Sequence, residues 1–339
     1  MNDPPVAVLP AIDPTKVRQV LEQKHDRPLV ACRYHPTGRQ VFFGAEDNYV
    51  HRFDLDGKNE VPLAGHDSWV RAIGFSPDGT TLYTGGYDGR LIWWPAAAAN
   101  PKPTRVVDAH AGWVRALAVG GSSPRFVATC GNDQLIKLWN PETGSLIAEC
   151  RGHTQQVYNL VVASDGETLI SCDLKGNLKE WNTQTGALKR DLSPAATLYK
   201  YDTTFRADIG GSRSIALAGD GKQLALGGIT NVTNAFAGIG NAAIVLVNLE
   251  DGKVLRQLEA EQKVNGVAWG VAWHPAGFWI GLAGGGGGGW LYFFKPDATS
   301  EFFKFKLPND GRDLSLSPDG RHVAVAHADK SLRIYALFA

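Results

Sequence analysis

Residues 64–94 read AGHDSWVRAIGFSPDGTTLYTGGYDGRLIWW, and they carry the strongest structural signal in the chain. An apolar segment leads into the glycine turn SPDG, a second segment (TLYTGGYD) follows, and a third (RLIWW) ends in tryptophan. A fourth segment of the same kind, TRVVDAH, comes at residues 104–110. Short runs of Val, Ile, Leu and aromatic residues between Gly and Asp clusters are typical of β-strands joined by tight turns. No stretch of the chain keeps a helical period over three turns, so we expect very little helix.

The same order of segments recurs along the whole chain. SPDG returns at residues 317–320, and related turns are HPTG (35–38), ASDG (163–166), AGDG (218–221) and HPAG (274–277). The steps between their last glycines are 41, 87, 55, 56 and 43 residues. The step of 87 spans two units, and GGSSPR at residues 120–125 marks the turn of the hidden one. Seven units of four strands, with a period in the forties, predict an all-β, seven-bladed β-propeller.

The third strands and the unit starts suggest a family. KLWN (137–140) and KEWN (179–182) resemble the tryptophan-ended strand of WD repeats, and AGH (64–66), DAH (108–110) and RGH (151–153) resemble their Gly-His opening. His25 fits the same slot in the first unit. The chain is therefore identified as a member of the WD-repeat (WD40) family from about residue 17 to residue 339. The resemblance implies four antiparallel strands per blade and a non-catalytic protein-interaction scaffold.

The two ends of the chain are expected to close the ring together. The segment 331–338 is a third strand with no fourth strand after it, and residues 16–23 have no other partner. We expect these N-terminal residues to pair beside the C-terminal strand, because a closed ring leaves no open edge. Residues 1–15 are predicted to be an extension and residues 16–339 a single propeller. The predicted blades are 27–64, 68–108, 112–151, 155–207, 212–261, 265–308, and 311–339 together with 16–23.

The resemblance also implies a buried network inside each blade. A buried carboxylate is costly unless donors satisfy it, and imidazole, hydroxyl and indole groups supply them. A hydrolase triad is rejected for these residues, because the set recurs once per repeat, as packing does and catalysis does not. In blade four we place Lys175 at the position of the Asp, while His153, Ser171 and Trp181 are retained. The complete networks are His66, Thr84, Asp88 and Trp94 in blade two, and His110, Thr129, Asp133 and Trp139 in blade three.

The resemblance places the partner-binding surface on one rim of the ring. Positions three and five residues after each repeat His surround the central channel there, and the residue before each turn Asp faces the same way. Tryptophan and arginine are enriched in binding hot spots, and arginine binds carboxylate or phosphate through paired donors. We therefore expect an acidic or phosphorylated peptide; the alternative is that these residues pair with neighbouring blades around a water-filled channel. The candidates are Trp69, Arg71, Tyr87, Trp113, Arg115, Asn132, Tyr158, Arg213, Trp269 and Arg312.

Three irregular stretches interrupt the repeats. Residues 229–241 are predicted to form a long connection at the rim of blade five, and Gly284–Gly289 a flexible loop in blade six. A phosphate-binding role for these glycines is disfavoured, because the Lys-Ser/Thr ending and the helix of a P-loop are missing. Residues 194–211 lengthen the link between blades four and five, where Tyr199, Tyr201, Phe205 and Arg206 either form a contact surface or wrap the blade edge.

Composition narrows the remaining classes of function. Lys plus Arg and Asp plus Glu are 34 each, so no overall field favours nucleic acid, and that function remains a disfavoured alternative. A propeller enzyme with a ligand at the channel mouth is the other alternative, but no nucleophile motif, carboxylate pair or metal-ligand spacing supports it. We expect no catalytic residue, cofactor or metal, no membrane association, and a monomer. Cys32, Cys130, Cys150 and Cys172 lie in apolar runs and predict buried, reduced thiols, hence a cytoplasmic protein.

Overall fold

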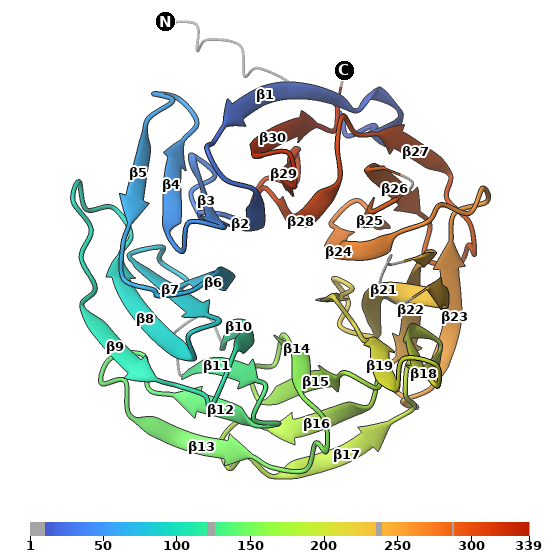
Figure 1. Cartoon of the computed structure of the whole chain (residues 1–339), viewed down its shortest axis with the longest axis horizontal. Coiled ribbons are helices and arrows are strands. Elements are labelled where there is room, and N and C mark those ends of the chain that lie inside the picture. The colour runs from blue at the N-terminus through green and yellow to red at the C-terminus, as the bar shows by residue number, and fades with distance from the viewer. Residues whose placement is uncertain (1–10, 121–125, 235–238, 287, 339) are drawn as a thin grey trace, which may run out of the picture.

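The computed structural model describes residues 11–120, 126–234, 239–286 and 288–338. Strands form seven four-stranded antiparallel sheets, which stand around a central channel like the blades of a propeller (Figure 1). The only helices in the described part are two short 3-10 turns, η1 (Pro14–Lys16) and η2 (Ala196–Leu198), and neither is long enough to cross a membrane. The predicted seven-bladed, all-β architecture is confirmed.

Blades one to four take their strands in sequence order, from the channel outward. Blade one holds β2 (Leu29–Tyr34), β3 (Gln40–Ala45), β4 (Val50–Asp54) and β5 (Glu60–Leu63). Blade two holds β6 (Val70–Phe75), β7 (Thr81–Gly86), β8 (Arg90–Pro95) and β9 (Arg105–Asp108). Blade three holds β10 (Val114–Gly120), β11 (Phe126–Gly131), β12 (Ile136–Trp139) and β13 (Leu146–Cys150). Blade four holds β14 (Val157–Val162), β15 (Thr168–Asp173), β16 (Leu178–Asn182) and β17 (Leu188–Leu192).

Blades five and six follow the same order, and blade seven is assembled from both ends of the chain. Blade five holds β20 (Ser214–Leu217), β21 (Gln223–Asn234), β22 (Ile239–Asn248) and β23 (Val254–Glu259). Blade six holds β24 (Val267–His274), β25 (Phe278–Gly284), β26 (Trp290–Phe294) and β27 (Phe303–Lys306). Blade seven holds β28 (Gly311–Leu316), β29 (His322–His327), β30 (Ser331–Ala336) and β1 (Arg18–Lys24).

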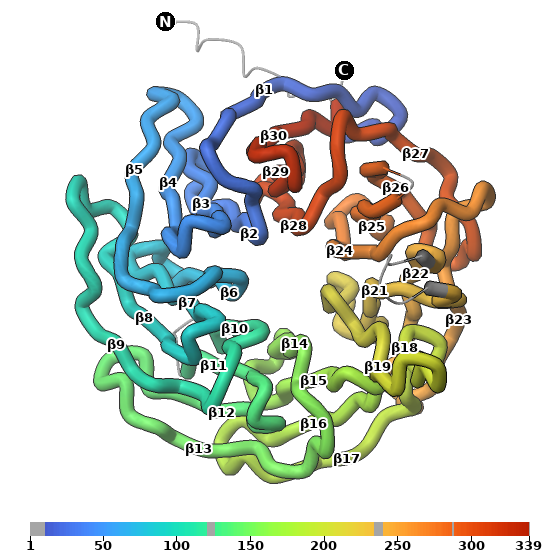
Figure 2. The backbone as a smooth tube through the Cα atoms, in the orientation of Figure 1, coloured from blue at the N-terminus to red at the C-terminus, as the bar shows by residue number. Residues whose placement is uncertain are grey.

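The ring is closed by β1 against β30. The two strands are antiparallel, with Arg18 opposite Ala336 and Lys24 opposite Ser331. Figure 2 shows the blue β1 segment lying outside the red β30 segment, as the fourth strand of blade seven. The guanidinium of Arg333 on β30 pairs with Glu22 on β1 at 2.8 Å. The closure predicted from the sequence is therefore confirmed.

The core lies between neighbouring blades. Phe42 of blade one packs with Leu82 and Trp94 of blade two in one fully buried cluster, and six further clusters of buried side chains are found in the described part. Because each sheet buries both faces against its neighbours, a blade is stabilised by the blades beside it. All four cysteines are buried and unpaired, and burial raises the pKa of Cys150 to about 12.

The glycine turns tie one blade to the next. Gly79 and Gly320 adopt φ angles of 73° and 71°, a left-handed conformation that favours glycine in the SPDG turn. The carbonyl of Gly79 lies 2.9 Å from Nε2 of His35 in blade one, and that of Gly320 lies 2.7 Å from Nε2 of His274 in blade six. The GGSSPR turn proposed for blade three falls on residues 120–125, of which 121–125 lie outside the described residues.

Two of the irregular stretches form strands. The insertion at 194–211 makes a separate two-stranded sheet of β18 (Tyr199–Asp202) and β19 (Ala207–Gly210). The connection expected at 229–241 is largely a continuation of β21 and β22, with Ile229 opposite Ala242 and Thr230 opposite Asn241. The expectation of a loop was therefore wrong for these paired residues. Residues 235–238 of the same stretch, which include Phe236, lie outside the described residues. Of the glycine run, Gly284 ends β25 and residue 287 is not described.

Candidate functional site

The histidine networks of blades two and three are present as hydrogen bonds. In blade two, Nδ1 of His66 lies 3.0 Å from Asp88, Nε2 lies 2.8 Å from Thr84 Oγ1, and the indole of Trp94 donates to the same hydroxyl at 2.8 Å. Blade three repeats this arrangement at 2.8, 2.8 and 2.9 Å. In blade two the bonds run from the turn between β7 and β8, through the histidine, to the buried hydroxyl and indole on these two strands. The blade-three residues are His110, Asp133, Thr129 and Trp139.

Blade four keeps its carboxylate, which corrects the assignment of Lys175 to the Asp position. Asp173 lies 3.1 Å from Nδ1 of His153, although it stands two residues before Lys175. Asp173 occupies the place of Gly86 in blade two, where an added Cβ would come within 2.5 Å of both Nδ1 of His66 and Asp88. A side chain from that place therefore points straight at the histidine, so the carboxylate reaches it from a different backbone position.

In six of the seven blades, a β-bulge at the rim end of the innermost strand aims one side chain toward the channel. The register shifts between Val70 and Ala72 in blade two and between Val114 and Ala116 in blade three, so that Arg71 and Arg115 are the extra residues. The extra residue of a bulge is released from the pairing pattern, and bulges commonly redirect a side chain at functional sites. Blades one, four, six and seven have the same irregularity. Their extra residues are Val30, Tyr158, Trp269 and Arg312.

The candidate residues form a belt in which arginines alternate with aromatic rings. Trp113 stacks on Tyr87 with ring centroids 4.0 Å apart and an interplanar angle of 4°. Arg115 lies 4.5 Å from the centroid of Trp113 and 4.3 Å from that of Tyr158. Beyond Tyr158, Arg213 lies 5.0 Å from its ring and 5.7 Å from that of Trp269, and Arg71 lies 5.5 Å from Trp269. These separations are typical of cation–π contacts.

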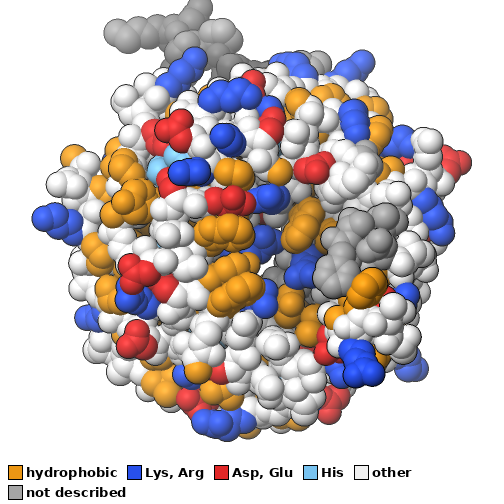
Figure 3. Space-filling model, in the orientation of Figure 1, with side chains coloured by type: hydrophobic (Ala, Val, Ile, Leu, Met, Phe, Trp, Pro, Cys, Tyr) orange, Lys and Arg blue, Asp and Glu red, His pale blue; other side chains and the backbone are white. Residues whose placement is uncertain are grey.

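This belt surrounds a pocket of about 380 Å³ at the mouth of the channel. Figure 3 shows hydrophobic, Lys and Arg side chains gathered around the central opening of this face. Nine of the ten candidates line the pocket, and the tenth, Asn132, accepts a hydrogen bond from Nε of Arg115 at 2.7 Å. Trp69 and Trp113 are each 40% exposed. Val30, five residues after His25, also lines the pocket, and the lining residues that the sequence did not indicate are Glu46, Asn159 and Ser212.

A smaller, polar chamber of about 120 Å³ adjoins the pocket. It shares Arg71, Arg115 and Arg213 with the outer pocket and is lined further along the innermost strands by Arg33 and Asp313. Asp313 accepts a hydrogen bond from the amide of Cys32 at 3.0 Å, and burial raises its pKa. Four arginines therefore face one carboxylate, which gives the chamber an excess of positive charge. The offsets from the repeat His that indicated the outer candidates carry no information on Arg33.

The arginines at the floor of the pocket lack carboxylate partners. Arg312 is paired with Glu46 at 2.6 Å, but among the described residues no ion pair joins Arg71, Arg115 or Arg213 to an acid. Nε of Arg213 and Oγ of Ser214 are buried without a hydrogen-bond partner in the same part of the chain. Burial and the nearby positive charges of Arg71 and Arg115 lower the pKa of Arg213. A buried, unsatisfied cation is costly, so an anionic group at this point is favoured.

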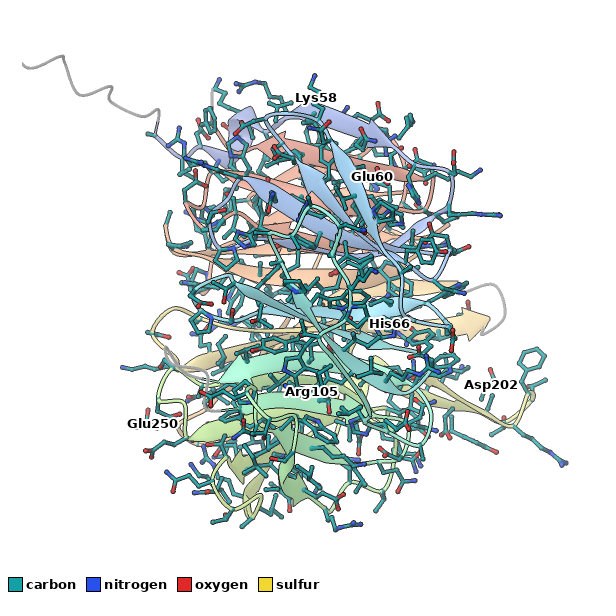
Figure 4. The ribbon with its side chains drawn as sticks, turned by 90° about the vertical axis from the view of Figure 1, so that its left-hand side faces the viewer. Lys58, Glu60, His66, Arg105, Asp202 and Glu250 are labelled. Atoms are coloured by element: carbon teal, nitrogen blue, oxygen red, sulfur yellow. The ribbon has the colours of Figure 1, made fainter. Side chains whose placement is uncertain are left out.

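The β18–β19 hairpin extends the site to one side. In Figure 4 it projects, with Asp202 near its end, from the face that Figure 3 presents. A side pocket of about 250 Å³ lies between the hairpin and the belt and shares Tyr158 and Arg213 with the main pocket. The insertion forms a hairpin beside the channel mouth (Figure 1), with Tyr201 and Phe205 49% and 46% exposed.

The arrangement is suited to holding an anion next to apolar or aromatic surface. The guanidinium faces lie against aromatic rings, which leaves their in-plane N–H groups directed elsewhere. Among the described residues, the carboxylates that line the outer pocket and the inner chamber are Glu46 and Asp313, and no histidine is found in either lining. The site therefore places hydrogen-bond donors next to exposed aromatic surface.

Comparison with known proteins identifies the repeats. A family model described as WD domain, G-beta repeat matches residues 57–95, 101–140, 144–182 and 309–336. The first three matches each cover the outer strand of one blade and three strands of the next, so the repeat unit joins two blades. The protein belongs to the structural class of seven-bladed β-propellers, and WD40 repeats are found in four stretches of its chain.

The similarity between this chain and its relatives covers only part of each relative's length. The chain is 32% identical to telomerase protein component 1 of Mus musculus over 139 residues, which is 40% of this chain and 5% of that protein. It is 25% identical to protein groucho of Drosophila melanogaster over 189 residues, or 54% of this chain and 26% of that protein. The chain thus spans only a small fraction of the length of these relatives.

Proposed function

We propose that the protein is an interaction scaffold that binds an acidic or phosphorylated segment of a partner protein at the mouth of the channel. The observation that carries this proposal is the set of three arginines, Arg71, Arg115 and Arg213, that contact aromatic rings and form no ion pair with an acid in the described structure. A WD40 propeller fits a scaffold role, and one relative is named as a component of telomerase.

The electrostatics favour an anionic side chain over a neutral one. Cation–π contacts stabilise a guanidinium by about 0.5–2 kcal/mol without using its N–H donors. Those donors bind carboxylate or phosphate oxygens in pairs, and a phosphate offers more acceptor oxygens and more charge than a carboxylate. The unpartnered Nε of Arg213 at the pocket floor would gain its missing hydrogen bond. The anion is therefore expected to point down the channel toward Arg213.

The rim supplies contacts for the residues on either side of the anion. Trp69 and Trp113 expose flat apolar surface at the rim, and the β18–β19 hairpin adds Tyr201 on the blade-five side. Large aromatic side chains next to arginine are the residues that most often dominate binding energy at interfaces. We expect the partner to lie across the mouth as an extended peptide, with apolar residues close to its acidic or phosphorylated position.

The test uses labelled peptide pools in which the central residue is phosphoserine, glutamate or serine and the flanking positions are degenerate. The full chain should retain the phosphoserine and glutamate pools and release the serine pool. The double variant Arg115→Ala/Arg213→Gln should weaken retention at least about tenfold, because charged hydrogen bonds at a buried site are lost. Equal retention of all three pools by the wild-type chain would remove the proposal.

Matched variants separate binding from folding. Arg39→Ala changes an exposed arginine in the turn at the far end of β2 and should leave retention unchanged. Trp69→Ala/Trp113→Ala should reduce retention of both acidic pools, since the rim contacts are shared. A single-stranded oligonucleotide serves as the competing ligand: tighter binding to it than to any peptide, with a steep loss on adding salt, would favour the nucleic-acid alternative instead.

A further inference from the structure

Blade one has exchanged its hydrogen-bonded network for a cluster of two histidines and two carboxylates. The positions of Thr84 and Trp94 are taken by Phe43 and Phe53, which offer no hydroxyl and no indole N–H. His25 and Asp47 remain, and His51 on β4 now faces them from the position of Ile92. The hydroxyl that bonds to the histidine in blades two and three is therefore missing in blade one, so His25 needs a different hydrogen-bond or ligand partner.

Three donor atoms of the cluster converge on one point. Oδ2 of Asp47 lies 2.9 Å from Nε2 of His51 and 3.3 Å from Nε2 of His25, and ligand atoms of all three residues lie within 4.8 Å of one another. In a tetrahedral zinc site with bonds of about 2.0–2.1 Å, neighbouring donors are roughly 3.3–3.4 Å apart. The two separations that involve Asp47 lie at or somewhat below that spacing.

A second carboxylate supports both imidazoles from behind. Oε1 of Glu60 lies 3.2 Å from Nδ1 of His25 and 2.9 Å from Nδ1 of His51. Metal-binding histidines almost always have their other nitrogen next to a carboxylate or carbonyl, which orients the ring and makes it a better ligand. Glu60 is itself held by Gln23, whose amide donates to Oε2 at 3.2 Å. The cluster thus has both the ligand residues of a metal centre and a residue that orients those ligands.

The remaining oxygen of Asp47 is already committed. The backbone amide of Tyr49 donates to Oδ1 at 3.0 Å, which leaves Oδ2 to face the two histidines. The side chains of His25 and His51 are 10% and 5% exposed, and that of Asp47 is 23% exposed. An ion can therefore reach the cluster from solvent, while most of its surroundings are protein.

We propose that His25, His51 and Asp47 bind a zinc ion, with Glu60 orienting both imidazoles and a water at the fourth position. Two imidazole nitrogens and one carboxylate oxygen are a donor set that zinc accepts readily and that magnesium does not favour. The proposal is independent of the peptide-binding site, because none of these four residues lines the channel mouth.

In the structure the two imidazole rings stand with centroids 4.4 Å apart between the two carboxylates. Zinc binds imidazole in its neutral form, so binding would release to solvent any protons that the two rings carry at the ligand nitrogens.

The position of the site gives the ion a structural effect. His25 directly follows β1, the strand that closes the ring, whereas Asp47, His51 and Glu60 belong to blade one. A metal bound here links the closing strand to the next blade. We therefore expect zinc to raise the unfolding temperature of the protein, because a ligand that binds only the folded state stabilises it.

The experiment titrates the chelator-treated full chain with zinc chloride by calorimetry, and with cobalt chloride by visible absorption. One ion per chain, the absorption of four-coordinate cobalt and a higher unfolding temperature with zinc are expected, and magnesium chloride should do nothing. No zinc heat and no cobalt band for the wild-type chain would overturn the proposal and leave the cluster as a proton-held ion-pair network.

Variants locate the site within the chain. His51→Gln should abolish the cobalt band, and Glu60→Gln should weaken zinc binding by about 10- to 100-fold while keeping all three ligands. His322→Gln, the same change at a histidine of blade seven outside the cluster, should leave binding unchanged. Circular dichroism without metal verifies that each variant is folded. Zinc binding that is unaffected by both His51→Gln and Glu60→Gln would place the ion elsewhere and contradict the assignment.

Discussion

At the scale of single residues, one hydroxyl joins the histidine of its network to the tryptophan. The carboxylate of Asp88 can only accept, so Nδ1 of His66 donates to it. In the neutral ring Nε2 is then an acceptor, so the hydroxyl of Thr84 donates its proton there while its oxygen accepts from the indole of Trp94. Each group in the chain of bonds has a role because its neighbour has the complementary one.

Thr84→Val should therefore destabilise the protein by about 2–4 kcal/mol, because it leaves two buried polar groups, the imidazole and the indole, without partners. Urea unfolding measures the difference. Thr80→Val, in the exposed turn beside Asp78, is the matched control and should change the free energy of unfolding by less than about 0.5 kcal/mol. Equal losses in the two variants would contradict the role given to the buried hydroxyl.

His327 makes the protein sensitive to acid. Its Nδ1 donates to the carbonyl of Asn309 at 3.0 Å, and Nε2 lies 3.2 Å from the hydroxyl of Tyr335, which fits a neutral ring. Burial, together with the charge of Arg333, lowers the pKa of His327 to about 4. An unfolded chain binds a proton at this residue below about pH 6.5, and the native chain does not until about pH 4. Stability should therefore fall as the pH drops through this window, by an order of about 3 kcal/mol.

His327→Gln is the variant that checks this contribution. Urea midpoints at about pH 7 and about pH 5 should differ less in the variant than in the wild-type chain, since its side chain takes up no proton. The comparison uses the slope with pH, so a uniform loss of stability in the variant does not obscure it. An unchanged slope would show that other groups cause the acid sensitivity.

The residue networks also show where repeat offsets succeed and where they fail. The offsets from His66 and His110 predicted groups that are hydrogen-bonded in the structure, because both blades share one backbone path. In blade four the same offset indicated Lys175, while the carboxylate comes from Asp173. A sequence offset records the position of a Cα atom, but the network depends on where a side chain ends. The His51 and Glu60 partners of His25 were missed for the same reason.

At the scale of elements, strand number and order followed from the turns, but pairing beyond the turns did not. The glycine turns indicated where each innermost pair of strands is joined. Residues 194–211 and 229–241 lack such signals, so a loop and a hairpin could not be distinguished for them in advance. The bulges that aim Arg71 and Arg115 toward the channel were also not predicted, because the sequence around these residues contains no signal that marks a change of register.

The closing strand β1 offers a prediction at this scale. Leu21 packs against the buried cluster between blades seven and one, whereas Val20 is 47% exposed on the same strand. Leu21→Asp should lower the free energy of unfolding by about 2–3 kcal/mol and promote aggregation, because β30 then has a weakly covered edge. Val20→Asp should have little effect. Thermal unfolding with light scattering measures both, and a larger effect of Val20→Asp would contradict the described register.

At the scale of the whole molecule, the balance of charge hides an uneven distribution. Lys plus Arg and Asp plus Glu are equal at 34, yet four arginines and one carboxylate line the inner chamber of the channel. The composition argues against a general attraction for polyanions. It could not reveal the local positive field of the channel, which arises only when the blades bring their arginines to the same axis. The rim position of the candidates was predictable from the family resemblance; the stacking that leaves the arginines without acidic partners was not.

The pairing of β1 with β30 has a consequence for how the protein is made. Arg18 leaves the ribosome long before Ala336, its partner across the strands, has been translated. During that interval the first blades can assemble on one another, but β1 has no sheet to join. Contacts between residues so distant in sequence form slowly, and strands that remain unpaired in the meantime are prone to aggregate with other chains. We therefore expect nascent chains of this propeller to depend on chaperones until β1 can pair with β30.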